Sequence, residues 1–470
     1  MRAARRTPRC CCRGTPFEHG GGAIESLESD TIGASRRSRA GDFHGQTTRI
    51  LAVREPPFRL LFTGSTIPAI GAQVTRVALP WLVSQLTGDP AQLGLVLGVM
   101  ALPRALFMLV GGAVVDRMSA RRMLLNARAV NAVPIGVLAA PVLVGGMRMW
   151  MLYALAPGIG LATVFADPAG SSLVPQLVEP EQRHAANSVF MGMRQLSLLI
   201  GPALAGLLIR VGSGAATTHG ARDTGIAFAI DALSFLCSVG SLSMIRVSSD
   251  RHPWAPAGSI FAKLIEGIRA LWRDQQMRAL VGYFAAGSVL LSGPLQVALP
   301  VLARTRLAPG AAAFGILMTA NASGMLVGSV ACGAVTRLTR GSLGMLLLCT
   351  DTCVSLVVAA MGEVHSLAAG AGIMVLTGMV GGTIQISLMT RLQRRVPQAL
   401  MGRTMSIVIF TFLRMAPLAA ALAGGLLKVR LLTELLMGAG LSLSVIALCS
   451  LTRPSMRAIR LASAAAPAGE

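Results

Sequence analysis

Charged residues are scarce in this chain of 470 residues: they make up 13% of it, about half the share of soluble globular proteins. Asp and Glu together number only 20, which argues against a carboxylate-rich metal or glycosidase site. Aromatic residues contribute 4% and hydrophobic residues 53%, and the mean hydropathy is +0.64. This balance excludes an ordinary cytosolic enzyme and a disordered protein, and favours a protein embedded in a bilayer.

The sequence also lacks the groupings of residues that would support other chemistries. Its eight cysteines form no Cys-x-x-Cys pair and no cluster with histidine, so we expect no metal site. No nucleotide-binding Gly-x-x-x-x-Gly-Lys-Ser/Thr signature is present, and no Gly-x-Ser-x-Gly or His-x-x-x-x-Asp pattern lies in the apolar segments. We therefore expect no cofactor and no enzymatic activity.

Basic residues outnumber acidic ones, and the formal net charge is +22. In a soluble protein this excess would suggest nucleic acid as a partner. Here the basic residues stand mostly between long apolar runs, where they set topology and meet anionic lipid headgroups. We expect membrane lipid as a partner and no nucleic acid.

Twelve apolar segments follow one another from about residue 58 to 452, and each approaches the roughly 20 residues that a spanning helix needs. The predicted spans are 58–83, 92–115, 123–145, 149–173, 185–210, 225–246, 278–303, 311–335, 342–361, 365–390, 404–427 and 432–452. No charged ring or filter-like loop is visible, so a channel is disfavoured.

Lys and Arg are distributed unequally between alternate loops. With the N-terminus inside, the inner loops hold sixteen of them and the outer loops with their flanks hold seven. The bias predicts that both termini are cytoplasmic.

The chain contains a weak internal repeat. Val77-Ala78-Leu79-Pro80 recurs at 297–300, and Gly112-Ala113-Val114 recurs at 333–335, offsets of 220 and 221. Each match lies in the corresponding helix of a six-helix half, which predicts two parallel halves related by an axis along the membrane normal.

We expect five regions in all. They are a disordered cytoplasmic tail (1–54), a first six-helix half (55–246), a cytoplasmic linker with an amphipathic helix (247–277), a second half (278–452) and a cytoplasmic tail (453–470). The first tail has no apolar region like that of a signal peptide. An alternative is a misassigned start, with translation beginning at Val53; a native peptide from 10–30 would exclude it.

The loop after the second span carries a recognisable signature. Gly112, Asp116, Arg117, Arg121 and Arg122 occur in the order Gly-x-x-x-Asp-Arg-x-x-x-Arg-Arg. This pattern resembles the loop 2–3 motif of the major facilitator superfamily. The resemblance implies that Asp116 latches the cytoplasmic side shut with Arg117 and Arg121. Ser119 replaces a glycine of the family motif. In the corresponding loop of the second half, Arg337 occupies the position at which a second motif would have its aspartate. The alternative is that the arginines only set topology.

The fifth span carries a glycine pattern made of Gly192, Gly201, Pro202 and Gly206. It resembles the antiporter motif of exporters in the same superfamily, which implies outward release; the alternative is a glycine-rich packing face. The match extends through Asp167-Pro168-Ala169-Gly170, Arg194-Gln195, Gly402-Arg403 and Ala416-Pro417, and is similar to the branch that includes enterobactin exporters and macrolide efflux proteins. The Arg-x-x-Gln-Gly motif of many proton-coupled members is missing.

Ionisable residues inside the spans are costly and are therefore candidates for function. Three aspartates are candidates for proton coupling: Asp167 in the inner third of its span, Asp231 in the outer third and Asp351 near the middle. Arg128 is a further partner for them. Candidates for lining the substrate path are Arg76, Arg104, Arg194 and Arg414, and the lesser candidates are Gln73, Thr75, Gln195, Gln296, Asn321 and Gln385. Structural ion pairs or bridges between helices are the alternative for each.

Together these features predict an all-α membrane protein with twelve transmembrane helices in two parallel six-helix halves. The resemblance implies a monomeric secondary transporter of a bacterial inner membrane. It would export a small amphiphilic molecule, such as a drug, siderophore or secondary metabolite, in exchange for protons. The alternatives are an importer or facilitator on the same fold, and a membrane assembly component that transports nothing.

Overall fold

The computed structural model describes residues 56–115, 119–212, 220–245, 269, 272, 275–308, 310–338, 343–395, 415–427 and 431–452. All regular structure in these ranges is helical. The first six helices are α2 (Pro56–Thr87), α3 (Pro90–Val115), α4 (Ala120–Leu143), α5 (Met149–Leu177), α6 (Arg183–Gly212) and α7 (Gly220–Ser243). The later ones are α9 (Gln275–Gly287), α10 (Gly293–Thr305), α11 (Ala311–Leu338), α12 (Leu343–Ala359), α13 (Leu367–Arg395), the Met415–Leu427 helix and α15 (Leu432–Thr452).

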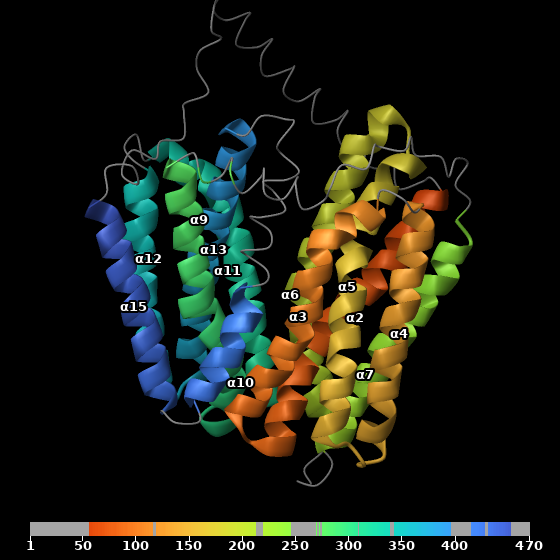
Figure 1. Ribbon diagram of the computed structural model, residues 1–470, viewed down its shortest axis with the longest axis horizontal. Helices are drawn as coiled ribbons and strands as arrows, with labels where there is room; N and C mark the ends of the chain where they lie inside the picture. Colours follow the sequence, from red (N-terminus) through yellow and green to blue (C-terminus); the bar gives the residue numbers. More distant parts are fainter. Residues whose placement is uncertain are drawn as a thin grey trace, which may run out of the picture.

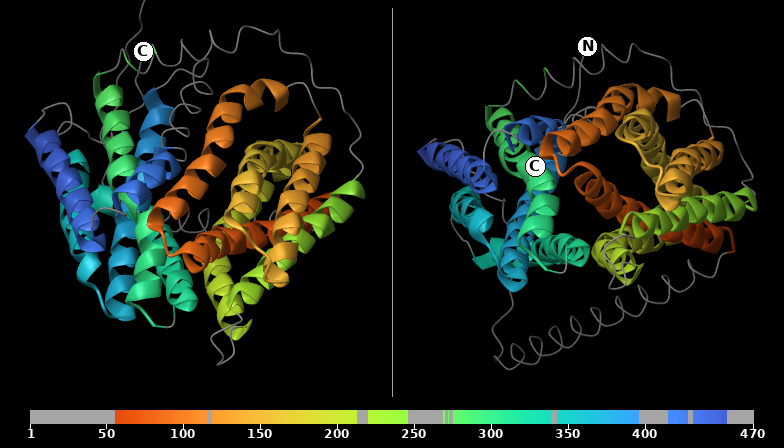
Figure 2. Two further views of the ribbon diagram at one scale, coloured as in Figure 1. Left: turned by 60° about the horizontal axis from the view of Figure 1, so that its bottom comes forward. Right: turned by 90° about the horizontal axis from the view of Figure 1, so that it is seen from below.

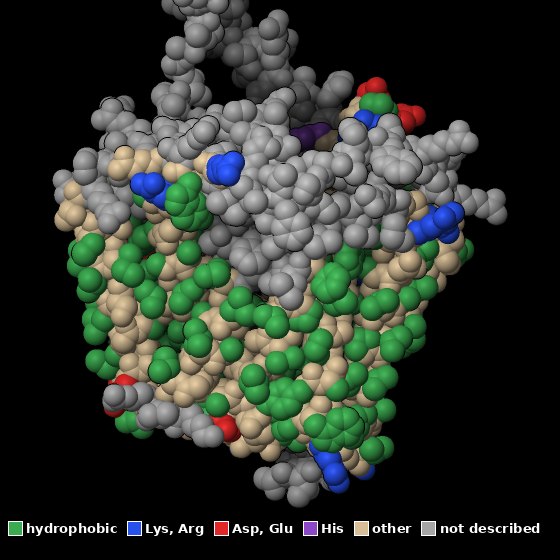
Figure 3. All heavy atoms as spheres, viewed as in Figure 1, with side chains coloured by type: hydrophobic (Ala, Val, Ile, Leu, Met, Phe, Trp, Pro, Cys, Tyr) green, Lys and Arg blue, Asp and Glu red, His purple; other side chains and the backbone are tan. Residues whose placement is uncertain are grey.

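Each predicted span coincides with helix in the described ranges. Short 3₁₀ turns, η1 (Pro180–Gln182) and η3 (Ala360–Glu363), lie at helix ends. A π-helical turn, η2 (Ser288–Ser292), joins α9 to α10, so these three elements form one span. Eight of the described helical segments are long and apolar enough to cross a membrane. On the face shown in Figure 3, hydrophobic side chains cover the middle of the molecule, and Lys and Arg lie toward its ends. These features are those of a multi-pass membrane protein.

The helices form two groups (Figures 1 and 2). The N-terminal half contains α2 to α7, and the C-terminal half contains α9 to α15. The two groups converge at the end that carries the loop between α2 and α3, and separate toward the other end (Figure 1). We call these the closed end and the open end. A continuous apolar core includes residues of both halves, among them Leu82, Leu302 and Phe314.

Two loops at the closed end have the same backbone conformation. Gly88, between α2 and α3, has φ +64°, and Gly310, before α11, has φ +62°. This left-handed conformation is open to glycine at little cost. The two positions are separated by 222 residues, which agrees with the offset of 220 to 221 in the sequence repeat. The halves therefore repeat each other in loop geometry as well as in helix order.

Candidate functional site

The two halves meet at the closed end through pairs of glycines. On α3, a Cβ atom at Gly94 would lie 2.5 Å from the carbonyl oxygen of Ala420 and 3.0 Å from the Cα of Gly424. A Cβ at Gly424 would in turn lie 2.5 Å from the carbonyl oxygen of Pro90. Because neither position has room for a side chain, α3 and the Met415–Leu427 helix touch backbone to backbone. We call this contact the first crossing.

A second crossing joins α6 to α11. A Cβ at Gly206 would lie 3.2 Å from the Cα of Gly315, and a Cβ at Gly315 would lie 2.5 Å from the carbonyl oxygen of Pro202. Gly315 follows Gly94 by 221 residues and Gly424 follows Gly206 by 218, so the internal repeat relates the two crossings. Of these four glycines, only Gly206 was predicted from the sequence. The missed signal is the spacing of small residues four apart, as at Ala420 and Gly424.

Loop residues complete the closed end. A Cβ at Gly310 would lie 3.2 Å from the Trp81 ring of α2, and one at Gly88 would lie 3.4 Å from the guanidinium of Arg304 on α10. Each half thus places a large side chain over the turn of the other half.

The glycine motif of α6 has three different environments. Gly201 packs on α2, where its Cβ would lie 2.8 Å from Cγ of Gln73, while Gly206 lies in the second crossing. Pro202 is buried and its carbonyl oxygen faces Gly315. No atom lies within 4 Å of the Cβ position of Gly192. The motif therefore connects α6 both to α2 and to the opposite half.

Asp231 is fully buried between α2, α4 and α7. The hydroxyl of Thr75 on α2 donates to its carboxylate, and Ser234 Oγ lies 3.3 Å from Oδ1. Arg128 of α4 interacts electrostatically with it and lies 5.6 Å from the Phe235 ring centroid. Gly71 of α2 leaves room for the carboxylate. Asp231 lies near the middle of α7, because this helix begins at Gly220, before the start of the predicted span at 225.

Asp351 lies in the other half, at the middle of α12, and is also buried. The hydroxyl of Tyr283 on α9 donates to its carboxylate. The pair joins α12 to α9, and no sequence pattern had indicated Tyr283 as the partner. Asp167 lies on α5, where its backbone is described and its side-chain surroundings are not.

The remaining path candidates are dispersed over the described helices. Arg76 is exposed on α2 and its Nη1 lies 3.4 Å from Gln73 Oε1. Asn321 Nδ2 donates to the Met374 carbonyl at 3.3 Å, so it bridges α11 and α13. The other candidates are all partly buried: Arg104, Arg194, Gln195, Gln296 and Gln385. Arg414 lies outside the described residues, as do the tails and most of the linker with its expected amphipathic helix.

The loop 2–3 motif is described only at its end. Asp116 and Arg117 lie outside the described residues, and the surroundings of Gly112 are not described. Arg122 is exposed. Arg121 binds the last carbonyls of α7, with Nη2 2.7 Å from the Ser243 oxygen and Nε 3.4 Å from that of Leu242.

A second arginine mirrors this arrangement at the other end of the same pair of helices. Arg222, near the start of α7, donates from Nε to the Leu143 carbonyl at the end of α4, at 3.2 Å. Cations at helix C-termini satisfy free carbonyls and complement the helix dipole. The arginines therefore fasten α4 and α7 together at both ends.

Replacing Arg121 by alanine is expected to destabilise the protein by about 1 kcal/mol, because the α7 carbonyls lose a charged donor. Thermal unfolding in detergent measures this as a fall in Tm of about 2 °C. Arg121→Lys keeps the charge and should lose less. Arg59→Ala, at an exposed position near the same end of the molecule, is the control. Equal Tm values for Arg121→Ala and Arg59→Ala would contradict the capping role.

Comparison with known proteins places this geometry in context. The model of the family described as Major Facilitator Superfamily matches residues 61–421. The multidrug efflux pump Tap of Mycolicibacterium fortuitum is 28% identical over 431 residues, covering 87% of this chain and 98% of Tap. The enterobactin exporter EntS of Escherichia coli O1:K1 / APEC is 24% identical over 373 residues, covering 79% and 85%.

A solved structure has the same arrangement of helices. This structure shows a bacterial homologue of the iron transporter ferroportin in an inward-facing state. Its TM-score with this chain is 0.64, and the two sequences are 17% identical. The match covers 84% of this chain and 99% of that one. At this identity the likeness shows the fold alone.

Proposed function

Because the chain belongs to the Major Facilitator Superfamily, whose model matches most of its length, we propose that it is an exporter of small amphiphilic molecules. Drug-like compounds, siderophores and secondary metabolites are the substrate classes. The direction is supported by Tap and EntS, which are named for efflux and export. The mechanism is alternating access, in which the halves rock about a path between them and no cofactor is needed.

The two glycine crossings are the observation that carries this proposal. They join the halves backbone to backbone at one end, and no side chain has to be removed to separate them. Rocking requires contacts that form and break as units, and flat glycine surfaces meet this requirement. Because the second crossing includes Gly206 and the Pro202 carbonyl of the exporter-type motif, one end of the motif belongs to the surface that must open for outward release.

The positive charge of the inner loops supports the orientation of the proposed exporter. With both termini in the cytoplasm of a bacterium, the closed end faces outward across the inner membrane and the described state is inward-facing. Export then requires the crossings at Gly94–Gly424 and Gly206–Gly315 to separate after the open end has closed.

We assign proton coupling to Asp231. Its carboxylate meets Thr75 of α2, Ser234 of α7 and the charge of Arg128 on α4. The same helix α2 presents Gln73 to Gly201 of the α6 motif. A proton arriving at Asp231 therefore removes the negative charge from a contact of α2, and α2 packs on the helix that carries the second crossing.

The experiment that tests export compares metabolites inside and outside cells of a deletion strain and an overexpressing strain. The exporter is expected to leave at least one compound retained in the deletion strain and depleted from overexpressing cells. If the deletion strain retains no compound, export of a native metabolite is contradicted, and an importer, an exporter of foreign drugs or a protein that transports nothing is favoured instead. Enrichment of a compound inside overexpressing cells would favour an importer. The Asp231→Asn variant is expressed in the same host as a comparison. A transporter that needs Asp231 should lose the effect on metabolites, whereas a protein with a purely structural role should keep it.

A further inference from the structure

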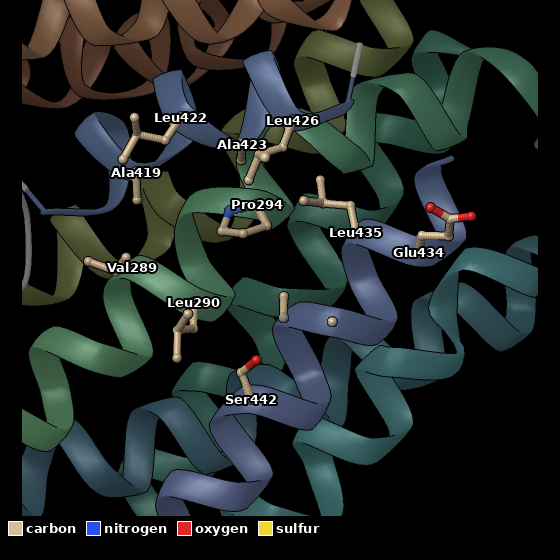
Figure 4. A pocket seen from close by; sticks show the side chains of 12 residues that line it. Val289, Leu290, Pro294, Ala419, Leu422, Ala423, Leu426, Glu434, Leu435 and Ser442 are labelled. Carbon is tan, nitrogen blue, oxygen red and sulfur yellow. The ribbon is translucent and has the colours of Figure 1, made fainter. Parts of the chain in front are cut away.

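The C-terminal half contains a cavity that the path between the halves does not include. It has a volume of about 500 Å³, within the range of sites for drug-sized ligands. It lies between η2 and α10 on one side, the Met415–Leu427 helix on another and α15 on the third (Figure 4). We call it the lateral groove. One of its walls, the Met415–Leu427 helix, belongs to the outer surface, since Leu422 is 70% exposed and Leu426 is 56% exposed.

The π-helical turn shapes one wall of the lateral groove. Val289 and Leu290, both within η2, line it. Just beyond the turn, a Cβ at Gly293 would lie 2.5 Å from Cβ of Ala419, so the span is pressed against the neighbouring helix there. Single π turns inside helices occur frequently at functional sites. Here the span packs closely against the neighbouring helix at Gly293, whereas within the turn, at Val289, it borders the open space of the groove.

A stripe on α15 forms the opposite wall. Glu434, Gly438 and Ser442 lie four residues apart on one face, so the stripe is about 12 Å long. No atom lies within 4 Å of the Cβ position of Gly438. The wall is therefore recessed where Gly438 stands, between a carboxylate at one end and a hydroxyl at the other.

The chemistry of the walls selects one kind of occupant. Leu435, Pro294 and Ala423 are typical of the lining, which is almost entirely apolar. Among the described residues that line it, Glu434 alone carries a charged side chain. It lies in the first turn of α15, beyond Leu435 at one end of the groove (Figure 4). An anionic amphiphile would be repelled there, whereas a cationic head would be attracted while its hydrocarbon part replaces lipid along the apolar wall.

We propose that the lateral groove binds a cationic amphiphile, with its apolar body between η2 and α15 and its positive head at Glu434. As a place where a transported compound exchanges with the bilayer, the groove rests on the proposed function. As a binding site it does not, because occupancy is measured without transport.

The test is photolabelling of the full-length protein in phosphatidylcholine nanodiscs. The probe is an alkyl trimethylammonium that carries a benzophenone, with a carboxylate analogue of the same length for comparison. Peptide mass spectrometry locates the label. We expect it on residues 419–426 and 435–442, with at least about tenfold less labelling by the carboxylate analogue.

Two glycine variants make the test specific. Gly438→Leu fills the groove without a clash and should lower labelling of these peptides by about tenfold or more. Gly425→Leu is the matched control: it is on an exposed face, nothing lies within 4 Å of its Cβ position, and it does not line the groove. Its labelling should equal that of the unchanged protein. Glu434→Gln should reduce the preference for the cationic probe over the carboxylate probe.

Three results would overturn the proposal: label located elsewhere, equal labelling by both probes, or equal labelling of Gly438→Leu and Gly425→Leu. Equal labelling by both probes would indicate that the groove binds lipid chains whatever the charge of the headgroup. Vesicle transport is measured in parallel. Transport without groove labelling contradicts the groove alone, and groove labelling without transport contradicts the exporter alone.

Discussion

Replacing Gly315 by leucine is expected to lower transport by about tenfold or more while the protein still folds. Its Cβ would lie 2.5 Å from the Pro202 carbonyl oxygen and 3.0 Å from the Cα of Gly206, in the opposite half. Overfilling a packed contact costs about 1–3 kcal/mol. Because the crossing exists only when this end is closed, the cost falls on one conformation. About 2 kcal/mol shifts the balance toward the state open at this end by roughly thirtyfold.

The internal repeat supplies a replicate of this prediction, and the glycine motif of α6 supplies a control. Gly94→Leu, in the other crossing, should have the same effect, since its Cβ would lie 2.5 Å from the Ala420 carbonyl oxygen. Gly192→Leu should leave transport close to normal, because no atom lies within 4 Å of its Cβ position. Uptake of a fluorescent amphiphile into inside-out vesicles measures all three. A folded Gly315→Leu protein with a normal rate would show that the crossing does not need to close.

Replacing Asp231 by asparagine should abolish the use of a proton gradient, lowering gradient-driven accumulation by about tenfold or more. Asparagine retains an oxygen that accepts from Thr75, so the contact between α2 and α7 is preserved and the ionisable group alone is lost. Flow of substrate down its own gradient should continue.

Asp351→Asn is the comparison, because it also keeps an acceptor for its Tyr283 partner. Asp351 joins α12 to α9 and has no link in the described contacts to the motif on α6, so we expect gradient-driven accumulation within about twofold of normal. Vesicles with an imposed pH difference measure both variants. Undiminished gradient-driven accumulation by Asp231→Asn would remove Asp231 from the coupling mechanism.

Hydropathy predicted the helices well because a spanning helix must be apolar over a fixed length. The span expected at 432–452 is α15 (Leu432–Thr452), and that expected at 149–173 is α5 (Met149–Leu177). The π turn at Ser288–Ser292 could not be predicted, since hydropathy does not distinguish π from α hydrogen bonding. The start of α7 was misplaced because polar residues such as Arg222 and Asp223 are helical there.

The sequence identified costly residues but not what they contact. Asp231 was singled out because it is ionisable in an apolar span, and it is fully buried. Its neighbour Thr75 comes from a helix 156 residues away, which no local pattern indicates. Asn321 was a path candidate because it is polar within a span, with a bridge between helices as the alternative, and its contact with Met374 is such a bridge. Polarity in a span thus predicts that a residue has a specific partner, and the fold decides which.

Glycine positions were predicted only where they formed a known motif. Gly206 was expected from the α6 pattern, whereas its partner Gly315 was not, because it lies in the opposite half. The offset of the repeat pointed to related halves without indicating where they touch. Contact surfaces between halves depend on how two separate bundles meet, and one sequence read segment by segment does not contain that information.

The central claim is that the two halves alternate to carry an amphiphile out of the cell. The most direct measurement is accumulation of a fluorescent amphiphile in inside-out vesicles that hold the unchanged protein, compared with Gly315→Leu, with and without a proton gradient. The account predicts accumulation that needs the gradient, collapses with a protonophore and is lost in Gly315→Leu. Accumulation in right-side-out vesicles instead, or no difference between the two proteins, would contradict it.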